Sequence, residues 1–178
     1  PKEDVLIEYI LHAIARPKDL AALRIAVTAG PTQEPLDPVR YLTNHSTGKM
    51  GYALARAAAM RGADVTLIHG ETALQPVKFT TDVPVTTAQQ MYEAVTSRFD
   101  ATDVLIMAAA VADYRPAAVA NDKIKKKDGD MNVAGAGFGV DTNVVTLITP
   151  DGTRELPLMS KADVADAILD EILKRRSQ

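Results

Sequence analysis

Short apolar segments alternate with segments of helical periodicity along the first part of the chain, and this alternation restricts the fold more than any other feature. Residues 24–28 and 63–70 are predicted to be strands, with a helix over residues 48–61 between them. Residues 83–99 predict a short strand and a helix, and residues 103–108 predict another buried strand. Such units join parallel strands through right-handed crossovers. The sequence therefore predicts an α/β domain with a Rossmann-like, doubly wound, mainly parallel sheet.

The two ends of the chain carry different patterns. Helical spacing predicts a helix within residues 1–22 that has four apolar side chains on one face: Val5, Leu6, Ile10 and Ile14. Towards the C-terminus, two β-like segments flank Asp151-Gly152, which is a strong hairpin signal. Ser160 is placed to cap a final amphipathic helix. We expect the C-terminal hairpin to extend or edge the main sheet and to support dimerisation.

Composition and charge restrict the function. Of the 178 residues, 47% are apolar and 24% are charged, which is typical of a globular domain. The net charge of −3 argues against nucleic acid as the main partner, because such domains usually carry a basic face. The chain has no cysteine, and no apolar run approaches the ~18–20 residues that cross a bilayer. The sequence thus predicts a soluble, cytoplasmic domain that contacts neither membrane nor nucleic acid.

One long segment interrupts the regular pattern. Eighteen residues, "GPTQEPLDPVRYLTNHST", separate the first predicted strand from the helix that follows. They include three prolines and show almost no periodicity. Irregular loops of this length inside a compact domain are more often functional than accidental. The segment is therefore a candidate site.

The end of this loop, "NHSTGKMG", leads directly into the predicted helix. Ser46, Thr47 and the amides near Gly48 offer donors at a helix N-terminus, where phosphate binds readily, and Lys49 adds a cation. A helix that is merely well capped is the competing interpretation. The segment does not fit a Walker A loop. It is also a poor dinucleotide fingerprint, because Ser46 occupies the first glycine position.

Small and charged residues follow the last predicted strand of the sheet. Ligands of parallel sheets bind beyond the carboxyl ends of the strands, and Ala108, Ala109 and Ala110 would let a flat base or a ribose lie against the backbone there. Asp113 can accept from a hydroxyl or help to hold a metal. The run "NDKIKKKDGD" contains four lysines. A solvated charge cluster and a role for Lys123 beside the phosphate site are both open interpretations.

Three stretches carry a family resemblance. "TAGPTQEPLDPVRYLTNHSTGKMG", "AAAVADYRPAAVANDKIKK" and "AGFGVDTNVVTLI" resemble phosphopantothenoylcysteine synthetase, and the resemblance covers nearly the whole chain from Leu23. Members of this family join 4′-phosphopantothenate to cysteine through an amide bond. In many bacteria the enzyme is the C-terminal half of a bifunctional coenzyme A biosynthesis protein, behind a flavin-dependent decarboxylase. Bacterial members of that type use CTP, form an acyl-cytidylate and release pyrophosphate.

The resemblance also assigns roles to residues by motif. It implies that Asn44 binds the acyl intermediate and phosphopantothenate, and that Arg40 contributes to this site or to the subunit contact that builds it. It implies that Lys123 recognises the nucleotide and helps to form the acyl-cytidylate. Binding of the nucleotide and its phosphates is expected from a further set: Gly30, Ser46, Thr47, Gly48, Lys49, Ala109, Ala110 and Asp113. Mg²⁺ is expected as a bridge between phosphates, with its protein ligands left open.

Domain boundaries and partners follow from the same resemblance. Residues 1–22 are expected to be a linker helix from a missing decarboxylase half, and residues 23–178 to be the synthetase domain, which forms a homodimer. Near residues 131–134 the chain runs straight on where the family has several tens of residues more. Those residues are either deleted or belong to a disordered region across which ordered pieces are joined.

Two alternatives to a CTP-dependent ligase follow. The shortened middle leaves open a catalytically impaired nucleotide-binding or assembly domain. An NAD(P)-binding reductase, with Glu71 as the ribose acid, is disfavoured by the long first loop and by the lack of a Tyr-x-x-x-Lys pair.

Overall fold

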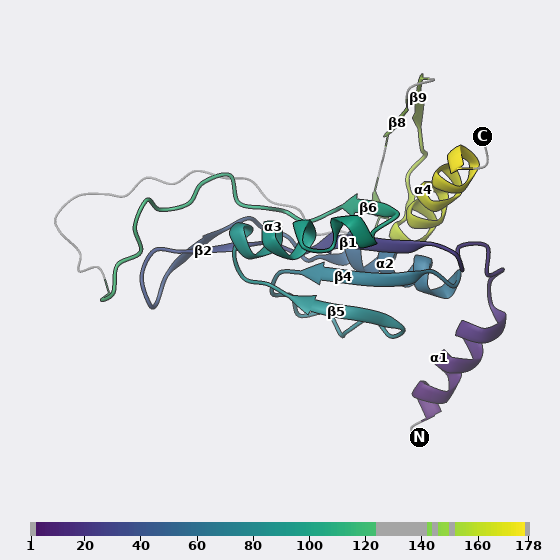
Figure 1. Ribbon diagram of the computed structural model, residues 1–178, viewed down its shortest axis with the longest axis horizontal. Coiled ribbons are helices and arrows are strands. Elements are labelled where there is room, and N and C mark those ends of the chain that lie inside the picture. Colours follow the sequence, from purple (N-terminus) through teal and green to yellow (C-terminus); the bar gives the residue numbers. More distant parts are fainter. Residues whose placement is uncertain (1–2, 124–141, 144–145, 150–151, 177–178) are drawn as a thin grey trace.

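The computed structural model describes residues 3–123, 142–143, 146–149 and 152–176, and its centre is a sheet of four parallel strands (Figure 1). In spatial order the strands are β5 (Thr80–Pro84), β4 (Asp64–His69), β1 (Arg24–Ala29) and β6 (Val104–Met107). All three pairings are parallel. Along the chain, β4 and β5 are added on one side of β1, and β6 is then added on its other side. The strand order therefore reverses direction at β1. The predicted α/β fold with a mainly parallel sheet is confirmed.

Helices and three small ribbons complete the described chain. The helices are α1 (Glu3–Ile14), α2 (Lys49–Met60), α3 (Ala88–Thr96), the single 3₁₀ turn η1 (Phe99–Ala101) and α4 (Lys161–Arg176). Each ribbon pairs two antiparallel strands: β2 (Gln33–Pro35) with β3 (Tyr41–Thr43), β7 (Thr142–Asn143) with β10 (Met159–Ser160), and β8 (Thr146–Thr149) with β9 (Gly152–Glu155). Ser160 Oγ accepts a hydrogen bond from Asp163 N, as predicted for the cap of α4.

Three sequence expectations about strands need correction. The loop predicted to be irregular contains the β2–β3 hairpin, whose three-residue strands are too short to show a period. The strand predicted to be buried at residues 103–108 is only half-buried as β6, because β1 is its sole partner among the described strands. The β8–β9 hairpin forms a sheet of its own and projects from the domain (Figure 1), so it neither extends nor edges the main sheet. Its turn, which includes Asp151, lies outside the described residues.

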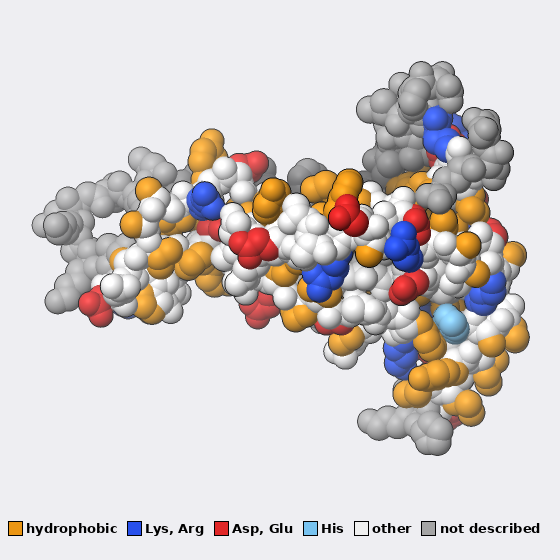
Figure 2. Space-filling model, in the orientation of Figure 1, with side chains coloured by type: hydrophobic (Ala, Val, Ile, Leu, Met, Phe, Trp, Pro, Cys, Tyr) orange, Lys and Arg blue, Asp and Glu red, His pale blue; other side chains and the backbone are white. Residues whose placement is uncertain are grey.

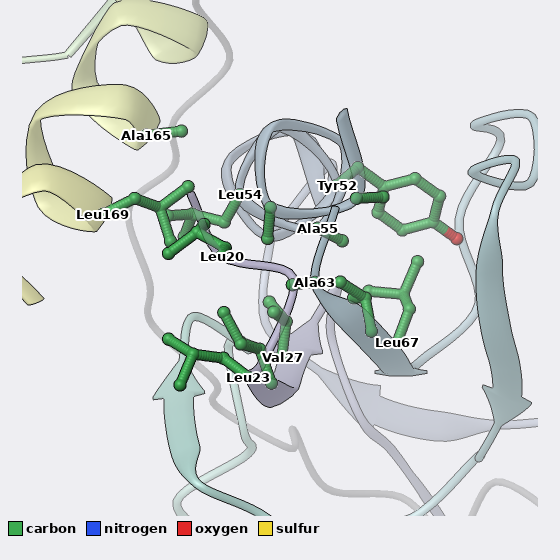
Figure 3. Close-up of a cluster of buried hydrophobic side chains, with 14 of the residues drawn as sticks. Leu20, Leu23, Val27, Tyr52, Leu54, Ala55, Ala63, Leu67, Ala165 and Leu169 are labelled. Carbon is green, nitrogen blue, oxygen red and sulfur yellow. The ribbon is translucent and has the colours of Figure 1, made fainter. Parts of the chain in front are cut away.

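The hydrophobic core lies between the sheet, α2 and α4 (Figure 3). Alanine at three buried positions of α2 lets the helix approach β1 closely: Ala55, Ala58 and Ala59. A Cβ atom added to Gly51 would lie 2.5 Å from Ala29 Cβ, so glycine is required at this contact. Leu169 brings α4 onto α2 and is fully buried, which contributes about 2 kcal/mol of transfer free energy. This packing fixes the N-terminus of α2 at the carboxyl edge of the sheet.

A buried arginine ties three segments together at the opposite end of α2. The Arg61 side chain is 8% exposed, and it donates to Asp19 from Nε at 2.9 Å and from Nη2 at 2.7 Å. Its Nη1 donates to Asp170 Oδ1 in α4 at 2.7 Å. These hydrogen bonds hold the pKa of the Asp19 carboxyl below its ordinary value. The same partners raise the pKa of Arg61.

Stability is expected to depend on pH through Asp19. Because its pKa is lowered in the folded state, its contribution is complete above its ordinary pKa of about 4 and is lost as the pH falls through the lowered value. We expect Asp19→Asn to lower the free energy of unfolding at pH 7 and to have a smaller effect at pH 3. Urea unfolding at both pH values measures the difference. The same loss at pH 3 as at pH 7 would contradict the ion-pair explanation.

Helix α1 rests on the domain through polar and aromatic contacts. Glu8 Oε1 accepts from Arg56 Nη1 in α2 at 2.8 Å. The ring of Phe79 lies between two rings of α1, stacked on His12 with centroids 4.0 Å apart and edge-to-face with Tyr9 at 4.9 Å. These contacts dock one side of α1 and leave its apolar residues largely outside the core.

The predicted apolar face of α1 is mostly exposed. Leu6, Ile10 and Ile14 are 53%, 47% and 75% exposed, and hydrophobic side chains gather over α1 at the lower right of Figure 2. The assignment of residues 1–22 as a linker helix stays a prediction. Within the described ranges, no helix combines the length and apolar character that a bilayer span requires.

Candidate functional site

Three glycines meet at the carboxyl edge of the sheet. Gly30 follows β1, Gly70 follows β4, and Gly48 precedes α2. A Cβ atom on Gly48 would lie 3.4 Å from Gly30 Cα and 2.8 Å from Thr72 Cγ2, and one on Gly70 would lie 1.7 Å from Pro31 O. Gly48 also has a φ of +73°, which side-chain-bearing residues adopt with strain. We call this contact of backbones the glycine junction; the fold itself requires it.

The N-terminus of α2 begins at the glycine junction without a side-chain cap. Gly48 is the N-cap residue, no side-chain cap hydrogen bond is formed by the described residues, and the first turn contains no acidic residue. Ser46 Oγ instead accepts from Gly48 N at 3.3 Å, one residue before the helix. Within the described residues, the side-chain cap that the competing interpretation requires is therefore missing. This helix end keeps the partial positive charge that favours a bound anion.

The loop after β6 lies directly beside the glycine junction. Ala110 N donates to Gly30 O at 2.8 Å, and Ala110 forms a parallel bridge with Pro31. Asn44 Nδ2 donates to Val111 O at 2.9 Å, which joins the long first loop to the loop after β6. Asn44, Gly30, Ser46, Gly48 and Ala110 are therefore brought together as predicted.

Other predicted residues near this edge are more open. Ala109 is half-buried, whereas Thr47 and Asp113 are exposed. Lys49 lies on the wall of a cavity of about 790 Å³ between α1, α2 and residues 74–78. Lys49 also directly follows Gly48, and its role in phosphate binding stays a prediction.

Arg40 and Lys123, the other basic residues predicted for the site, lie towards the outer end of the β2–β3 hairpin. Arg40 pairs with the buried Asp37, with Nε–Oδ2 at 3.0 Å and Nη2–Oδ2 at 2.5 Å, and so closes the hairpin turn. Ala120 N donates to Leu36 O in the same turn at 3.0 Å, three residues before the exposed Lys123. The green segment that leads to Lys123 runs outward with this hairpin in Figure 1. Lysines 125–127 lie outside the described residues.

Sequence reasoning missed a second cavity at the same edge of the sheet. It measures about 860 Å³ and lies over the ends of β4 and β5 against α3, where its wall includes Glu71, Thr72 and Glu93. Gln33 Nε2 donates to Glu71 Oε2 at 3.1 Å. The segment "HGET" after β4 was the only available signal, because the wall from α3 shows no motif.

Metal ligands are sparse near the glycine junction. Among the described residues, no three His, Cys, Asp or Glu side chains gather in a way that would hold a metal ion. Asp113, exposed and next to the loop after β6, is a single carboxylate. This donor set fits a Mg²⁺ ion that is held largely by ligand phosphates, as such ions often are.

A parallel α/β sheet with a glycine-bounded helix end at its carboxyl edge is an arrangement that many α/β domains use to bind phosphate groups. The family model described as "DNA/pantothenate metabolism flavoprotein C-terminal domain" matches residues 20–134 and 129–175. The chain belongs to this family.

Similar proteins agree with the family. The coenzyme A biosynthesis bifunctional protein CoaBC of Bacillus subtilis (strain 168) is 40% identical over an alignment 209 residues long. The alignment covers 86% of this chain and 52% of the relative. Its Escherichia coli (strain K12) counterpart is 37% identical over 215 residues, covering 88% and 53%. This chain thus spans about half the length of these relatives.

Solved structures extend the comparison. The crystal structure of the C-terminal domain of CoaBC superposes with a TM-score of 0.74 at 38% identity, covering 90% of this chain and 98% of that chain. A Cab2 mutant in complex with phosphopantothenate-cysteine has a TM-score of 0.51 at 18% identity, covers 88% of this chain and 65% of that chain, and shows the fold alone. The resemblance inferred from the sequence, to the synthetase half of the bifunctional protein, is confirmed.

Proposed function

We propose that the chain is the synthetase domain that joins 4′-phosphopantothenate to cysteine in coenzyme A biosynthesis, with CTP as the activating nucleotide. One observation carries the proposal: the uncapped N-terminus of α2 meets the loop after β6 at the glycine junction, in a chain of the pantothenate metabolism family. The family favours this ligase over the reductase alternative, although Glu71 lies at the end of β4.

The proposed reaction needs charge stabilisation and positioning rather than a nucleophile from the protein. A carboxylate oxygen of 4′-phosphopantothenate attacks the α-phosphorus of CTP, the bond to the leaving oxygen breaks, and pyrophosphate departs. The amine of cysteine then attacks the acyl carbon of the cytidylate, CMP leaves, and the amine loses a proton. Both steps place negative charge on phosphate oxygens, which the positive end of α2 stabilises.

The two groups of predicted residues suggest how the site is completed. Asn44, Ser46 and Gly48 lie at the glycine junction, whereas Arg40 and Lys123 lie towards the outer end of the hairpin. Exposed apolar side chains gather over the hairpin and the segment beside it, at the left of Figure 2: Val39, Tyr41, Tyr114 and Val119, which are 61%, 52%, 81% and 52% exposed. We propose that this surface pairs two copies of the chain and that the pairing brings the outer cations to a site.

Pyrophosphate release tests the proposed function. Full-length protein with CTP and Mg²⁺ should release pyrophosphate only when 4′-phosphopantothenate is present, and adding cysteine should give the amide product with CMP. Binding of CTP and 4′-phosphopantothenate without pyrophosphate release would favour the alternative of a catalytically impaired nucleotide-binding domain. Absence of both binding and release would reject a ligase and a nucleotide-binding domain alike.

A further inference from the structure

The loop after β6 is held by buried hydroxyl groups to which the sequence motifs assign no role. Thr28 is 1% exposed, and its Oγ1 accepts from Ala108 N at 3.1 Å and from Ala109 N at 3.2 Å. Thr32 is fully buried, and its Oγ1 accepts from Ala112 N at 2.9 Å. Two threonines of the "TAGPT" segment therefore hold three amides of the neighbouring loop.

Backbone groups of the first loop hold the same segment from the other side. Thr32 N donates to Ala110 O at 3.3 Å, and Ala110 N donates to Gly30 O at 2.8 Å. The carbonyl of Thr32 accepts from Thr43 Oγ1 at 2.7 Å, which ties the arrangement to β3. The backbone of residues 108–112 is thus fixed by hydrogen bonds at nearly every residue.

Two N–H groups of this loop take no part in these hydrogen bonds. None of the hydrogen bonds within the described parts of the chain uses the N–H of Val111 or of Asp113. The carbonyl of Val111 is already taken by Asn44. These two N–H groups are therefore donors that the loop beside the glycine junction still has for a ligand.

We infer that Thr28 and Thr32 are positioning residues for the ligand site: their hydroxyls hold residues 108–112 in the conformation that presents the Val111 and Asp113 N–H groups to an oxygen of the nucleotide or acyl substrate. This inference rests on the proposed function. A hydroxyl suits this task because it is a compact acceptor, and that of Thr28 reaches two amides from a buried strand. Valine has nearly the same shape but no acceptor, so it removes the hydrogen bonds while keeping the volume of the buried side chain.

Kinetics of full-length variants test the inference. We expect Thr28→Val and Thr32→Val each to raise the KM for CTP or 4′-phosphopantothenate at least about tenfold, because small displacements of a binding loop are costly. Thr28→Ser and Thr32→Ser retain the acceptor and should restore the KM. Thr80→Val is the matched control. Thr80 Oγ1 donates to Val77 O at a distance of 2.8 Å, and this hydrogen bond is not part of the loop after β6. Equal KM values for all three valine variants and the wild type would overturn the inference.

Hydrogen exchange separates failure of this inference from failure of the proposed function. The amides of Ala109 and Ala112 donate to the hydroxyls of Thr28 and Thr32, so they should be protected in the wild type and lose protection in Thr28→Val and Thr32→Val, respectively. This readout needs no substrate. If wild-type protein forms no amide product, the proposed function fails. If exchange at Ala109 and Ala112 is unchanged in the variants, the positioning role fails whatever the activity.

Discussion

Gly70→Ala is expected to destabilise the fold by more than about 4 kcal/mol, a size of effect that single substitutions rarely reach. The added Cβ atom would lie 1.7 Å from the carbonyl oxygen of Pro31 and 2.7 Å from its carbonyl carbon. Both are backbone atoms of the first loop, so no side-chain rotation relieves the collision. Either β4 or the loop after β1 must shift, and the glycine junction opens in both cases.

Gly62→Ala is the matched control for this prediction. Gly62 has a φ of +88°, and its added Cβ atom would lie 3.1 Å from Lys18 Cδ and 3.2 Å from Lys18 Cβ, contacts that a shift of a few tenths of an ångström relieves. The larger cost is then the strained backbone conformation, at about 1–2 kcal/mol. Urea unfolding of both variants measures the free energies. Similar losses for the two glycines would show that the approach of Gly70 to Pro31 is not as close as the structure has it.

The main sheet could be predicted from the sequence because its signals are local. Strands such as Arg24–Ala29 and Asp64–His69 are short, mostly apolar and largely buried segments, and α2 shows a clear helical period between Gly48 and Gly62. The β2–β3 hairpin could not be predicted in this way. Its register depends on contacts distant in sequence, such as the hydrogen bond from Ala88 N, at the start of α3, to the buried Glu34.

The sequence identified several residues that lie together at the candidate site, but it did not predict how all of the side chains are arranged there. Asn44, Gly48 and Ala110 belong to recognisable motifs, and they do lie together. The positions of Lys49 and Arg40 depend on side-chain direction and on pairing: Lys49 lies on the wall of another cavity, and Arg40 binds Asp37. No periodicity or motif encodes either outcome. The same holds for the hydroxyl of Thr28, which in sequence is one more residue of a buried strand.

Asn44→Asp is expected to have the largest effect on activity. Asn44 Nδ2 donates to Val111 O at 2.9 Å, whereas an aspartate oxygen can only accept and would place negative charge against that carbonyl. The substitution should displace the loop after β6 and repel the phosphate or acyl oxygens that the site has to bind. Loss of one such donor typically costs about 10²-fold or more in rate. We expect formation of the amide product to fall by that amount, and by more than the release of pyrophosphate.

Gln75→Glu is the control for this charge change. It makes the same conversion of amide to carboxylate at an exposed residue away from the glycine junction, and it should leave turnover within the experimental error. Full-length variants should be compared by product formation and pyrophosphate release from the same reaction. If Asn44→Asp matched Gln75→Glu in both, the hydrogen bond to Val111 would have no part in the reaction. Amide formation that falls while pyrophosphate release persists would instead place Asn44 at the acyl group, because only the second step then lacks its donor.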